Sequence, residues 1–459
     1  MNVIMKFGGT SVQDAEAMTR VINIVKKQWA DNPEDAPPVV VVSAMSKVTD
    51  RLIEAGRLAS LRQVEPAAQM VTDLLARHLS VASTLVKGLT LELLSDELTS
   101  EFGALSDVRT WATEGEVTPA AADALQAMGE LASSRIVAAA FRQNGVKCVW
   151  VDSRHVLVTD SEHSAALPDM DATAERCHTI LGAAIKAGHV PVMGGFIGAN
   201  EHGVTTTLGR GGSDYSAAIF GACLGVDEIQ IWTDVDGMLT ADPRVVSAPV
   251  LVPELSFNEA SELAYFGAKV LHPSTILPAV AKNIPVRILN SRRPEVRGTM
   301  ITAEGRGDGG TLTALACKRG VTVIDITSSR MLMAFGFLRR LFEVFERFRT
   351  PVDVVTTSEV SVSVTVDTTR RLDDIISNLR NFAEVSTKPD MAIVCIVGEN
   401  LRSDSTLFAR AVTALEKIPL RLVSQAGSRR NITFVMADSD VVAAMNLLHD
   451  QFFTAKVGA

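Results

Sequence analysis

The sequence has few cysteines and no long apolar run. Its five cysteines lie far apart, and none forms a CxxC pair. This spacing excludes a zinc-ribbon or thioredoxin-type motif and predicts reduced cysteines in a core. No apolar stretch approaches the ~18 residues that a membrane-spanning helix needs, and the chain reaches Lys6 and a glycine pair too early for a signal peptide. We therefore expect a cytoplasmic protein.

The chain also lacks an excess of positive charge. Lysine and arginine total 44 against 53 aspartates and glutamates, which gives a formal net charge of −9. Proteins that bind nucleic acid or an anionic membrane surface are typically basic over the binding face. The eight histidines include no HExxH pair, so no protein metal site is predicted. These absences favour small molecules as ligands, with neither nucleic acid nor membrane as a partner.

The first 300 residues alternate short apolar runs with longer amphipathic stretches. The runs are rich in valine and isoleucine, which is typical of strands buried on both faces of a parallel sheet. Between them, apolar residues recur at steps of three and four, as in amphipathic helices. The predicted strands lie within 39–45, 146–153, 189–198, 228–235 and 284–290. Because 459 residues are too many for one ordinary core, we predict an α/β domain over 1–300 and further, smaller modules.

A polar, glycine-rich stretch at 301–310 is the predicted linker. Beyond it, a similar order of strands and helices occurs twice, with a separation of about 70 residues. The order matches the βαββαβ pattern of a ferredoxin-like unit. We predict one α+β module over 311–388 and a second over 389–459, with a strand that the two could share. A plain α+β domain without a repeat is the alternative interpretation.

The first residues contain MKFGGTSV, in which a lysine and two glycines end an apolar run. Glycines after a buried strand allow backbone amides to point toward an anion. Lys6 would add a positive charge for phosphate oxygens, and Thr10 and Ser11 would donate hydrogen bonds or cap the next helix. The Walker pattern GxxxxGK[ST] is absent. Taken alone, these residues would also fit a tight turn with a surface lysine.

A second glycine cluster, TTTLGRGGSDYSAA, occupies 205–218. It places Arg210, three glycines and Asp214 where a helix begins, which predicts a second anion site. An arginine side chain can hold a carboxylate through two parallel hydrogen bonds. A helix cap alone would explain Ser213 or Asp214, but it would not explain the three glycines and the arginine.

A third cluster, IWTDVDGMLTADPRVV at 231–246, ends a predicted strand with Thr233 and Asp234 and continues to Arg244. Ligands of open α/β sheets bind beyond the carboxyl ends of strands, where all three clusters fall. Glycines, positive charges and carboxylates at such an edge are typical of phosphoryl transfer, in which lysine, backbone amides and Mg²⁺ neutralise the transferred group. The sequence therefore predicts a nucleotide-dependent phosphoryl transferase that needs no nucleophilic side chain.

Five motifs occur in a fixed order along the chain, namely KFGGTSV, TTTLGRGGSDYSA, WTDVDGMLTADPRVV, FGAKVLHP and VDVVTTSEVSVSVTVD. Together they resemble the aspartate kinases of the amino acid kinase superfamily, and most closely the monofunctional, lysine-sensitive kind. The resemblance covers nearly the whole chain and implies the amino acid kinase fold followed by two ACT modules. It also implies transfer of the ATP γ-phosphoryl group, with Mg²⁺, to the side-chain carboxylate of L-aspartate, the first step toward lysine, threonine and methionine.

The resemblance implies roles for individual residues. Lys6 and Asp214 are the implied catalytic residues, with Lys6 neutralising the transferred phosphoryl group and Asp214 organising Lys6. Glu130 would pair with the substrate ammonium and Arg210 with its α-carboxylate. The implied aspartate-binding residues are Ser43, Thr49, Glu130, Arg210 and Asp214. The implied nucleotide-binding residues are Lys6, Gly8, Gly9, Thr233, Asp234, Leu239, Arg244, Lys269 and Val270. Leu239 replaces a tyrosine of relatives that contacts the nucleotide.

The late motifs resemble the effector site of lysine-sensitive relatives, which lies between paired ACT modules. The implied effector residues are Met331, Phe337, Leu338, Val352, Asp353, Thr357, Ser358 and Glu359. Asp353 and Glu359 would hold the two ammonium groups of L-lysine, although capping of strand ends would also explain these carboxylates. We expect inhibition by L-lysine in a homodimer or homotetramer.

Two alternatives remain open. Another amino acid kinase, acting on glutamate or a nucleotide, would share Lys6 and the glycine loops, although Arg210 and the tandem modules argue against it. A non-catalytic amino-acid sensor would keep the ACT modules but would have no reason to retain four charged residues at glycine turns.

Overall fold

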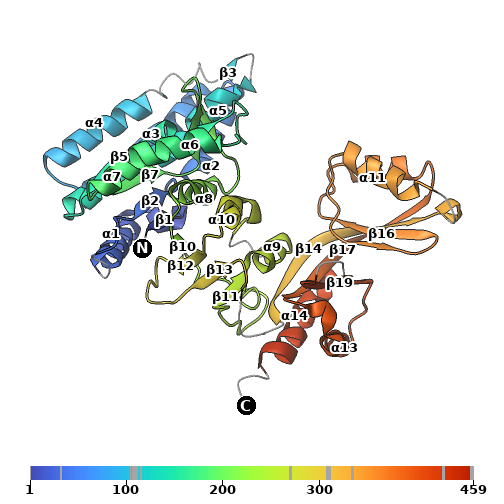
Figure 1. Ribbon diagram of the computed structural model, residues 1–459. Helices are drawn as coiled ribbons and strands as arrows, with labels where there is room; N and C mark the ends of the chain where they lie inside the picture. Colours follow the sequence, from blue (N-terminus) through green and yellow to red (C-terminus); the bar gives the residue numbers. More distant parts are fainter. Residues whose placement is uncertain are drawn as a thin grey trace. The chain divides into compact units, whose positions relative to one another are not determined.

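The computed structural model describes residues 2–30, 34–103, 105, 112–113, 116–267, 271–305, 312–331, 335–425 and 429–454. The chain forms two compact units, shown in Figure 1. The first consists of Met1–Met238 and Leu271–Gly305, and the second of Leu239–Val270 and Arg306–Ala459. Residues 239–270 fall within the predicted first domain over 1–300, but they pack with the C-terminal part. Of the predicted linker, 306–310 lie outside the described residues.

The first unit contributes seven strands to a mostly parallel sheet. Their spatial order is β13 (Thr299–Thr302), β12 (Val286–Asn290), β10 (Glu228–Thr233), β1 (Val3–Phe7), β2 (Val39–Val42), β7 (Val190–Gly194) and β5 (Cys148–Val151). β1 pairs in parallel with both β2 and β10, and β13 pairs antiparallel with β12. Every residue of β1 and β2 is buried, because helices cover both faces of the sheet.

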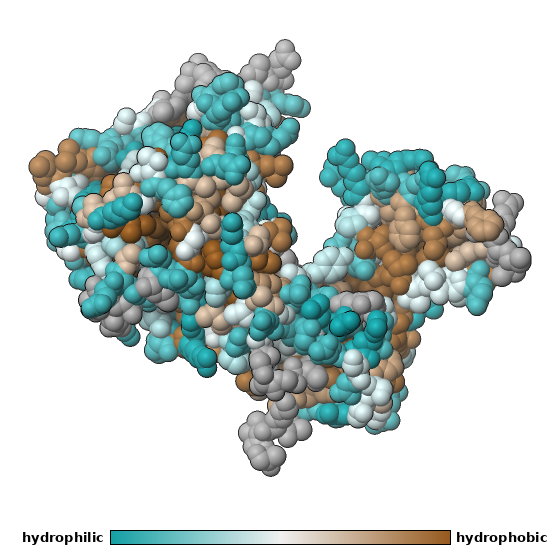
Figure 2. Space-filling view, viewed as in Figure 1, coloured by the Kyte–Doolittle hydropathy of each residue, from teal (hydrophilic) through white to brown (hydrophobic). Residues whose placement is uncertain are grey.

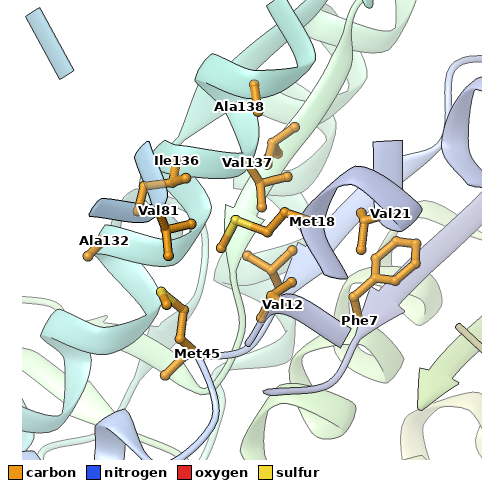
Figure 3. Close-up of a cluster of buried hydrophobic side chains, with 14 of the residues drawn as sticks. Phe7, Val12, Met18, Val21, Met45, Val81, Ala132, Ile136, Val137 and Ala138 are labelled. Atoms are coloured by element: carbon orange, nitrogen blue, oxygen red, sulfur yellow. The ribbon is translucent and has the colours of Figure 1, made fainter. Parts of the chain in front are cut away.

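The helices of the first unit surround this sheet. They are α1 (Ala15–Ala30), α2 (Val48–Ser60), α3 (Val64–Leu85), α4 (Leu89–Gly103), α5 (Pro119–Gln143), α6 (Met170–Arg176), α7 (Gly182–Lys186), α8 (Gly212–Leu224) and α10 (Leu277–Ala281). Met5 and Phe7 of β1 join a hydrophobic cluster with α1, α3 and α5, part of which is drawn in Figure 3. Because side chains alternate along a strand, Lys6 points to the opposite face, where α8 lies.

The single strand predicted over 189–198 was wrong, because the chain forms two strands there. β7 ends at Gly194, and β8 (Ile197–Asn200) joins a separate sheet with β6 (Val158–Thr159) and β9 (Thr205–Thr207). Phe196, between β7 and β8, has a φ of 68°, in the left-handed region. A residue in that conformation cannot continue a strand, so the chain leaves the main sheet. The short strands β3 (Ala112–Thr113) and β4 (Glu116–Val117) pair antiparallel before α5.

The second unit contains a six-stranded antiparallel sheet. Its spatial order is β15 (Val355–Thr357), β16 (Ser361–Val366), β14 (Leu312–Thr327), β17 (Glu384–Gly398), β19 (Asn431–Ala437) and β18 (Leu422–Ser424). The helices are α9 (Phe257–Tyr265), α11 (Phe337–Arg347), α12 (Leu372–Leu379), α13 (Ser405–Ala414) and α14 (Val441–His449), with the short strand β11 (Glu254–Ser256) before α9. β14 and β17 pair along nearly their whole length.

Two hydrophobic cores divide this second unit into the two ferredoxin-like modules. One core joins α11 and α12 to one half of the sheet, and the other joins α13 and α14 to the other half. Both β14 and β17 run through the two halves, so two strands are shared and the predicted boundary after residue 388 falls inside β17. α11 buries Phe337 and Leu341, and Figure 2 shows that its outer surface is mainly hydrophilic.

Candidate active site

The three glycine-containing clusters meet at one cavity of the first unit. The cavity has a volume of about 520 Å³ and lies beyond the carboxyl ends of β1, β2 and β10. Its lining residues are Lys6, Gly8, Gly9, Thr10, Ser43, Ala44, Met45, Ser46, Lys47, Thr49, Asp50, Glu130, Phe196, Gly209, Gly211, Gly212, Ser213, Asp214, Thr233 and Asp234. The prediction that these clusters share a site at the carboxyl edge is therefore consistent with the fold.

Two loops form one wall of the cavity. We define the first loop as 8–13, which follows β1, and the second loop as 43–47, which follows β2. The backbone N–H of Ser46 donates to the carbonyl oxygen of Gly9 over 3.1 Å. A Cβ atom at Gly9 would lie 3.0 Å from the carbonyl oxygen of Ala44, so a larger residue would push the loops apart. Glycine at position 9 thus lets the two loops pack closely.

Lys6 and Asp214 form an ion pair at the cavity. The Lys6 Nζ lies 2.5 Å from the Asp214 Oδ1, and the two side chains are 9% and 16% exposed. Asp214 lies in the first turn of α8, which at Gly212 packs closely against the turn between β7 and β8, because a Cβ atom there would lie 2.5 Å from the Phe196 ring. Asp214 therefore holds the Lys6 ammonium group at the cavity wall, where it can meet an anion.

Glu130 brings a buried carboxyl group to the same cavity. The residue lies within α5 and is only 4% exposed, and among the described residues no donor reaches its Oε2. Burial raises the pKa of Glu130 to about 8, although backbone hydrogen bonds at Ala44 and Glu130 and the charge of Lys6 lower it in part. The group is therefore mainly protonated at neutral pH until a cation approaches it.

Only some of the other residues predicted for aspartate or nucleotide binding line the cavity. Ser43 and Thr49 line the cavity. Arg210 lies on the loop before α8, but its side chain is exposed and is not part of the lining. Leu239 and Arg244 belong to the second unit, where Arg244 pairs with Asp242 at the surface. Lys269 and Val270 lie outside the described residues. The assignment of these four residues to nucleotide binding stays a prediction.

Asp123, which was not among the predicted site residues, is fully buried at the start of α5. Its carboxylate accepts hydrogen bonds from the Thr207 hydroxyl at 2.7 Å and from the backbone N–H groups of Ser164 and Thr207, and it lies 2.7 Å from the His163 Nδ1. These contacts fix the end of β9, which leads into the glycine loop of 208–212. An acidic residue among apolar helix positions was the available signal.

The predicted effector residues lie in the first ferredoxin-like module. Phe337 belongs to its hydrophobic core, and Met331 and Val352 pack against that core. Four of the predicted effector residues are exposed, namely Leu338, Thr357, Ser358 and Glu359. Asp353 already has partners within the chain. Its Oδ1 accepts from the Lys318 Nζ at 2.7 Å and the Tyr265 hydroxyl at 3.0 Å, while among the described residues no donor reaches its buried Oδ2.

Lys318 has a second carboxylate partner, because its Nζ also lies 2.7 Å from the Asp367 Oδ2. Burial alone would lower the pKa of Lys318, but its hydrogen bonds to Asp353 and Asp367 outweigh burial and raise it. The lysine therefore stays charged, and one ammonium group faces two carboxylates. The group of three side chains has a net charge of −1, which would favour a further cation near Asp353.

Comparisons with known proteins agree with this arrangement. The model of the amino acid kinase family matches residues 1–290, and the model of an ACT domain matches residues 394–452. The chain is 35% identical over 466 residues to the chloroplastic aspartokinase 3 of Arabidopsis thaliana, covering 99% of this chain and 82% of that protein. It is 34% identical over 461 residues to the lysine-sensitive aspartokinase 3 of Escherichia coli strain K12, and the match covers 98% of this chain and 99% of that protein.

A solved structure shares the fold over the same length. The crystal structure of E. coli aspartokinase III in complex with aspartate and ADP matches with a TM-score of 0.78 and 33% sequence identity. The match covers 99% of this chain and 100% of the E. coli chain. In addition, no helix among the described residues is long and apolar enough to pass through a lipid bilayer.

Proposed function

Since the chain belongs to the aspartokinases of the amino acid kinase family, we propose that it transfers the γ-phosphoryl group of ATP to the side-chain carboxylate of L-aspartate. The products are 4-phospho-L-aspartate and ADP. One observation carries this proposal: the Lys6–Asp214 ion pair and the buried Glu130 carboxyl group face a single cavity that the glycine loops surround.

Lys6 is the residue we propose for stabilising the transition state. Phosphoryl transfer depends mainly on positioning and on neutralising charge on the transferred group. The Lys6 ammonium group is held at the cavity by Asp214, and Gly8 and Gly9 leave room for phosphate oxygens beside it. The carboxylate of the substrate itself is the nucleophile, so no nucleophilic side chain is needed.

We assign Glu130 to the ammonium group of aspartate. A substrate ammonium would give the Glu130 Oε2 the partner that it lacks among the described residues, and it would favour the ionised form. Ser43 and Thr49 also line the cavity and would contact the bound aspartate. The aspartate would then lie against the second loop and the phosphates against the first.

The cavity also suits Mg²⁺. This ion prefers oxygen ligands and is usually held by one or two carboxylates together with substrate phosphates. Asp234 and Thr233 supply such oxygens at the cavity, whereas no cluster of three His, Cys, Asp or Glu side chains occurs in the described part of the chain. We infer that Asp234 would help to hold Mg²⁺ with the nucleotide. Bound there, the ion would neutralise charge on the phosphates.

A coupled assay of ADP release tests the proposed function. Purified protein with ATP and Mg²⁺ is expected to release ADP with L-aspartate and much more slowly with L-glutamate or no acceptor. Hydroxylamine should trap the acyl phosphate as a hydroxamate in amounts equal to the ADP. Release with glutamate alone would indicate a different amino acid kinase. Absence of release with every acceptor, in protein that binds lysine, would indicate a sensor.

Arg210 gives a further prediction. We propose that its guanidinium receives the α-carboxylate of aspartate when substrate is bound. Arg210→Lys keeps the charge but loses the two-pronged geometry, so KM for aspartate is expected to rise about tenfold while KM for ATP changes less than twofold. Steady-state kinetics with each substrate varied in turn would measure this. Equal changes in both KM values would instead indicate a role in folding of the loop.

We also propose that L-lysine inhibits the enzyme through the site around Asp353. Lys318, Asp353 and Asp367 together have a net charge of −1, which supports a cationic effector. The buried Oδ2 of Asp353 also supports one. Asp353→Ala is expected to raise the lysine concentration for half-inhibition at least tenfold. The matched control is Asp374→Ala, which removes only an exposed pair with Arg371. Inhibition curves that coincide for Asp353→Ala and the parent would assign lysine to another site.

A further inference from the structure

Arg77 of α3 joins the two loops that form one wall of the cavity. Its Nη1 donates to the carbonyl oxygen of Ser46 over 2.9 Å, and its Nη2 donates to the carbonyl oxygen of Gln13, also over 2.9 Å. Gln13 is the last residue of the first loop, and Ser46 lies in the second. One planar guanidinium group therefore fixes the separation of two backbone segments that are distant in sequence.

A direct backbone hydrogen bond also joins the two loops. Near the cavity, the Ser46 N–H donates to Gly9, so Ser46 is held through both its N–H and its carbonyl group. The next residue, Lys47, has a φ of 65°, a left-handed conformation that costs free energy for a residue with a side chain and persists only where its surroundings impose it. Arg77 is part of those surroundings because it holds the preceding carbonyl group.

We propose that Arg77 is a positioning residue for phosphoryl transfer. It does not line the active-site cavity, so it is not expected to touch either substrate. It holds the phosphate-binding loop and the aspartate-binding loop at the distance that transfer requires. This inference rests on the proposed function, in which the first loop meets the phosphates and the second meets aspartate.

The predicted signature is a loss of kcat with little change in either KM. Each loop would still bind its own substrate when Arg77 is absent, but the two reacting groups would no longer be held in line. A misplacement of about 1 Å can lower a rate by about 100-fold. Arg77→Met is therefore expected to lower kcat about 100-fold, with both KM values within about threefold of the parent. A general loss of folding would instead lower the active fraction and the melting temperature together.

Chemical rescue distinguishes positioning from a purely structural role. A second cavity, of about 470 Å³, is lined by Gln13, Asp14, Ser46, Lys47, Arg77, Ser80 and Val81. Truncation to Arg77→Ala would enlarge this space beside the two carbonyl groups. Guanidinium chloride at about 20 mM is expected to raise the kcat of Arg77→Ala at least tenfold, because the free ion can donate to both carbonyl oxygens. Sodium chloride at the same concentration should restore nothing.

Two further variants complete the test. Arg77→Lys keeps the charge but has a single nitrogen, so its kcat is expected to be at least tenfold lower than that of the parent. This variant provides the test if Arg77→Met and Arg77→Ala fold poorly. Arg51→Met is the control, because Arg51 pairs through its side chain with the exposed Asp73 and does not bridge the loops. Its kcat should stay within twofold of the parent.

The outcomes separate the two proposals. If the parent enzyme shows aspartate-dependent turnover and Arg77→Met or Arg77→Lys retains more than half of the parent kcat, the positioning role is wrong and the proposed function stands. A loss of kcat in Arg77→Ala that guanidinium does not restore would also overturn it. If the parent shows no turnover with aspartate, the proposed function fails first, and this inference fails with it.

Discussion

Replacement of Lys6 by alanine is expected to lower kcat about 10³-fold, equivalent to about 4 kcal/mol of transition-state stabilisation. The ammonium group lies at the cavity wall, 2.5 Å from Asp214, where it can neutralise charge on the transferred phosphoryl group. Since that charge is greatest in the transition state, kcat should fall far more than the affinity for ATP. Stopped-time ADP release, with nucleotide binding measured by calorimetry, would give both quantities.

The substitution also leaves the Asp214 carboxylate without its cation, so two variants are needed. Lys6→Ala combined with Asp214→Asn removes the unpaired charge, and its kcat should remain as low as that of Lys6→Ala. Lys26→Ala is the matched control, because the Lys26 ammonium group donates to the Asn144 carbonyl oxygen at the surface. Near-parental kcat in either folded Lys6 variant would mean that Lys6 does not act on the transferred group.

Glu130→Gln is expected to lower kcat/KM for L-aspartate about 10³-fold and to leave KM for ATP nearly unchanged. Glutamine has the shape of glutamate but cannot pair with the substrate ammonium as a charge. The loss is large because Glu130 is 4% exposed, so little water would replace the missing interaction. Steady-state kinetics would measure it, with the exposed Glu97→Gln as the control.

The raised pKa of Glu130 predicts proton release on substrate binding. Burial raises this pKa to about 8, so at pH 7 the empty site holds a proton that an ammonium ligand would expel. Apparent affinity for aspartate should therefore increase as pH rises from 6 to 8 and level off above that value. Calorimetry in two buffers of different ionisation enthalpy should count about one proton released in the parent and none in Glu130→Gln.

The same pKa also affects stability, with the opposite dependence on pH. The usual pKa of glutamate is 4.5, so between pH 4.5 and about 8 the folded state holds a proton that the unfolded state has lost. The Glu130 contribution to the free energy of unfolding thus falls as pH rises through this range. Glu130→Gln should melt at a higher temperature than the parent at pH 8.5 without substrate. A lower melting temperature would contradict the conclusion that burial disfavours the ionised form of Glu130.

The sequence by itself determined the central strands of the first unit and the glycine loops at their carboxyl ends. Strands buried on both faces need apolar residues at every position, so β1, β2 and β10 were readable from their own residues. Parallel strands bring their carboxyl ends to one edge, so the meeting of the three clusters also followed from local patterns. The long helices α2, α3 and α4 were not identified.

Only the tertiary structure decided which distant residues meet. Arg77 reaches carbonyl groups 31 and 64 residues away, and nothing in the helical pattern of α3 distinguishes it from a surface arginine. The sequence predicted Asp353 as a residue that binds a cation, but its pairing with Lys318 depends on segments that the sheet brings together. Residues 239–270 pack with the second unit although their sequence continues the first. Local sequence sets backbone conformation and burial over a few residues, whereas such partners depend on how complete elements pack against one another.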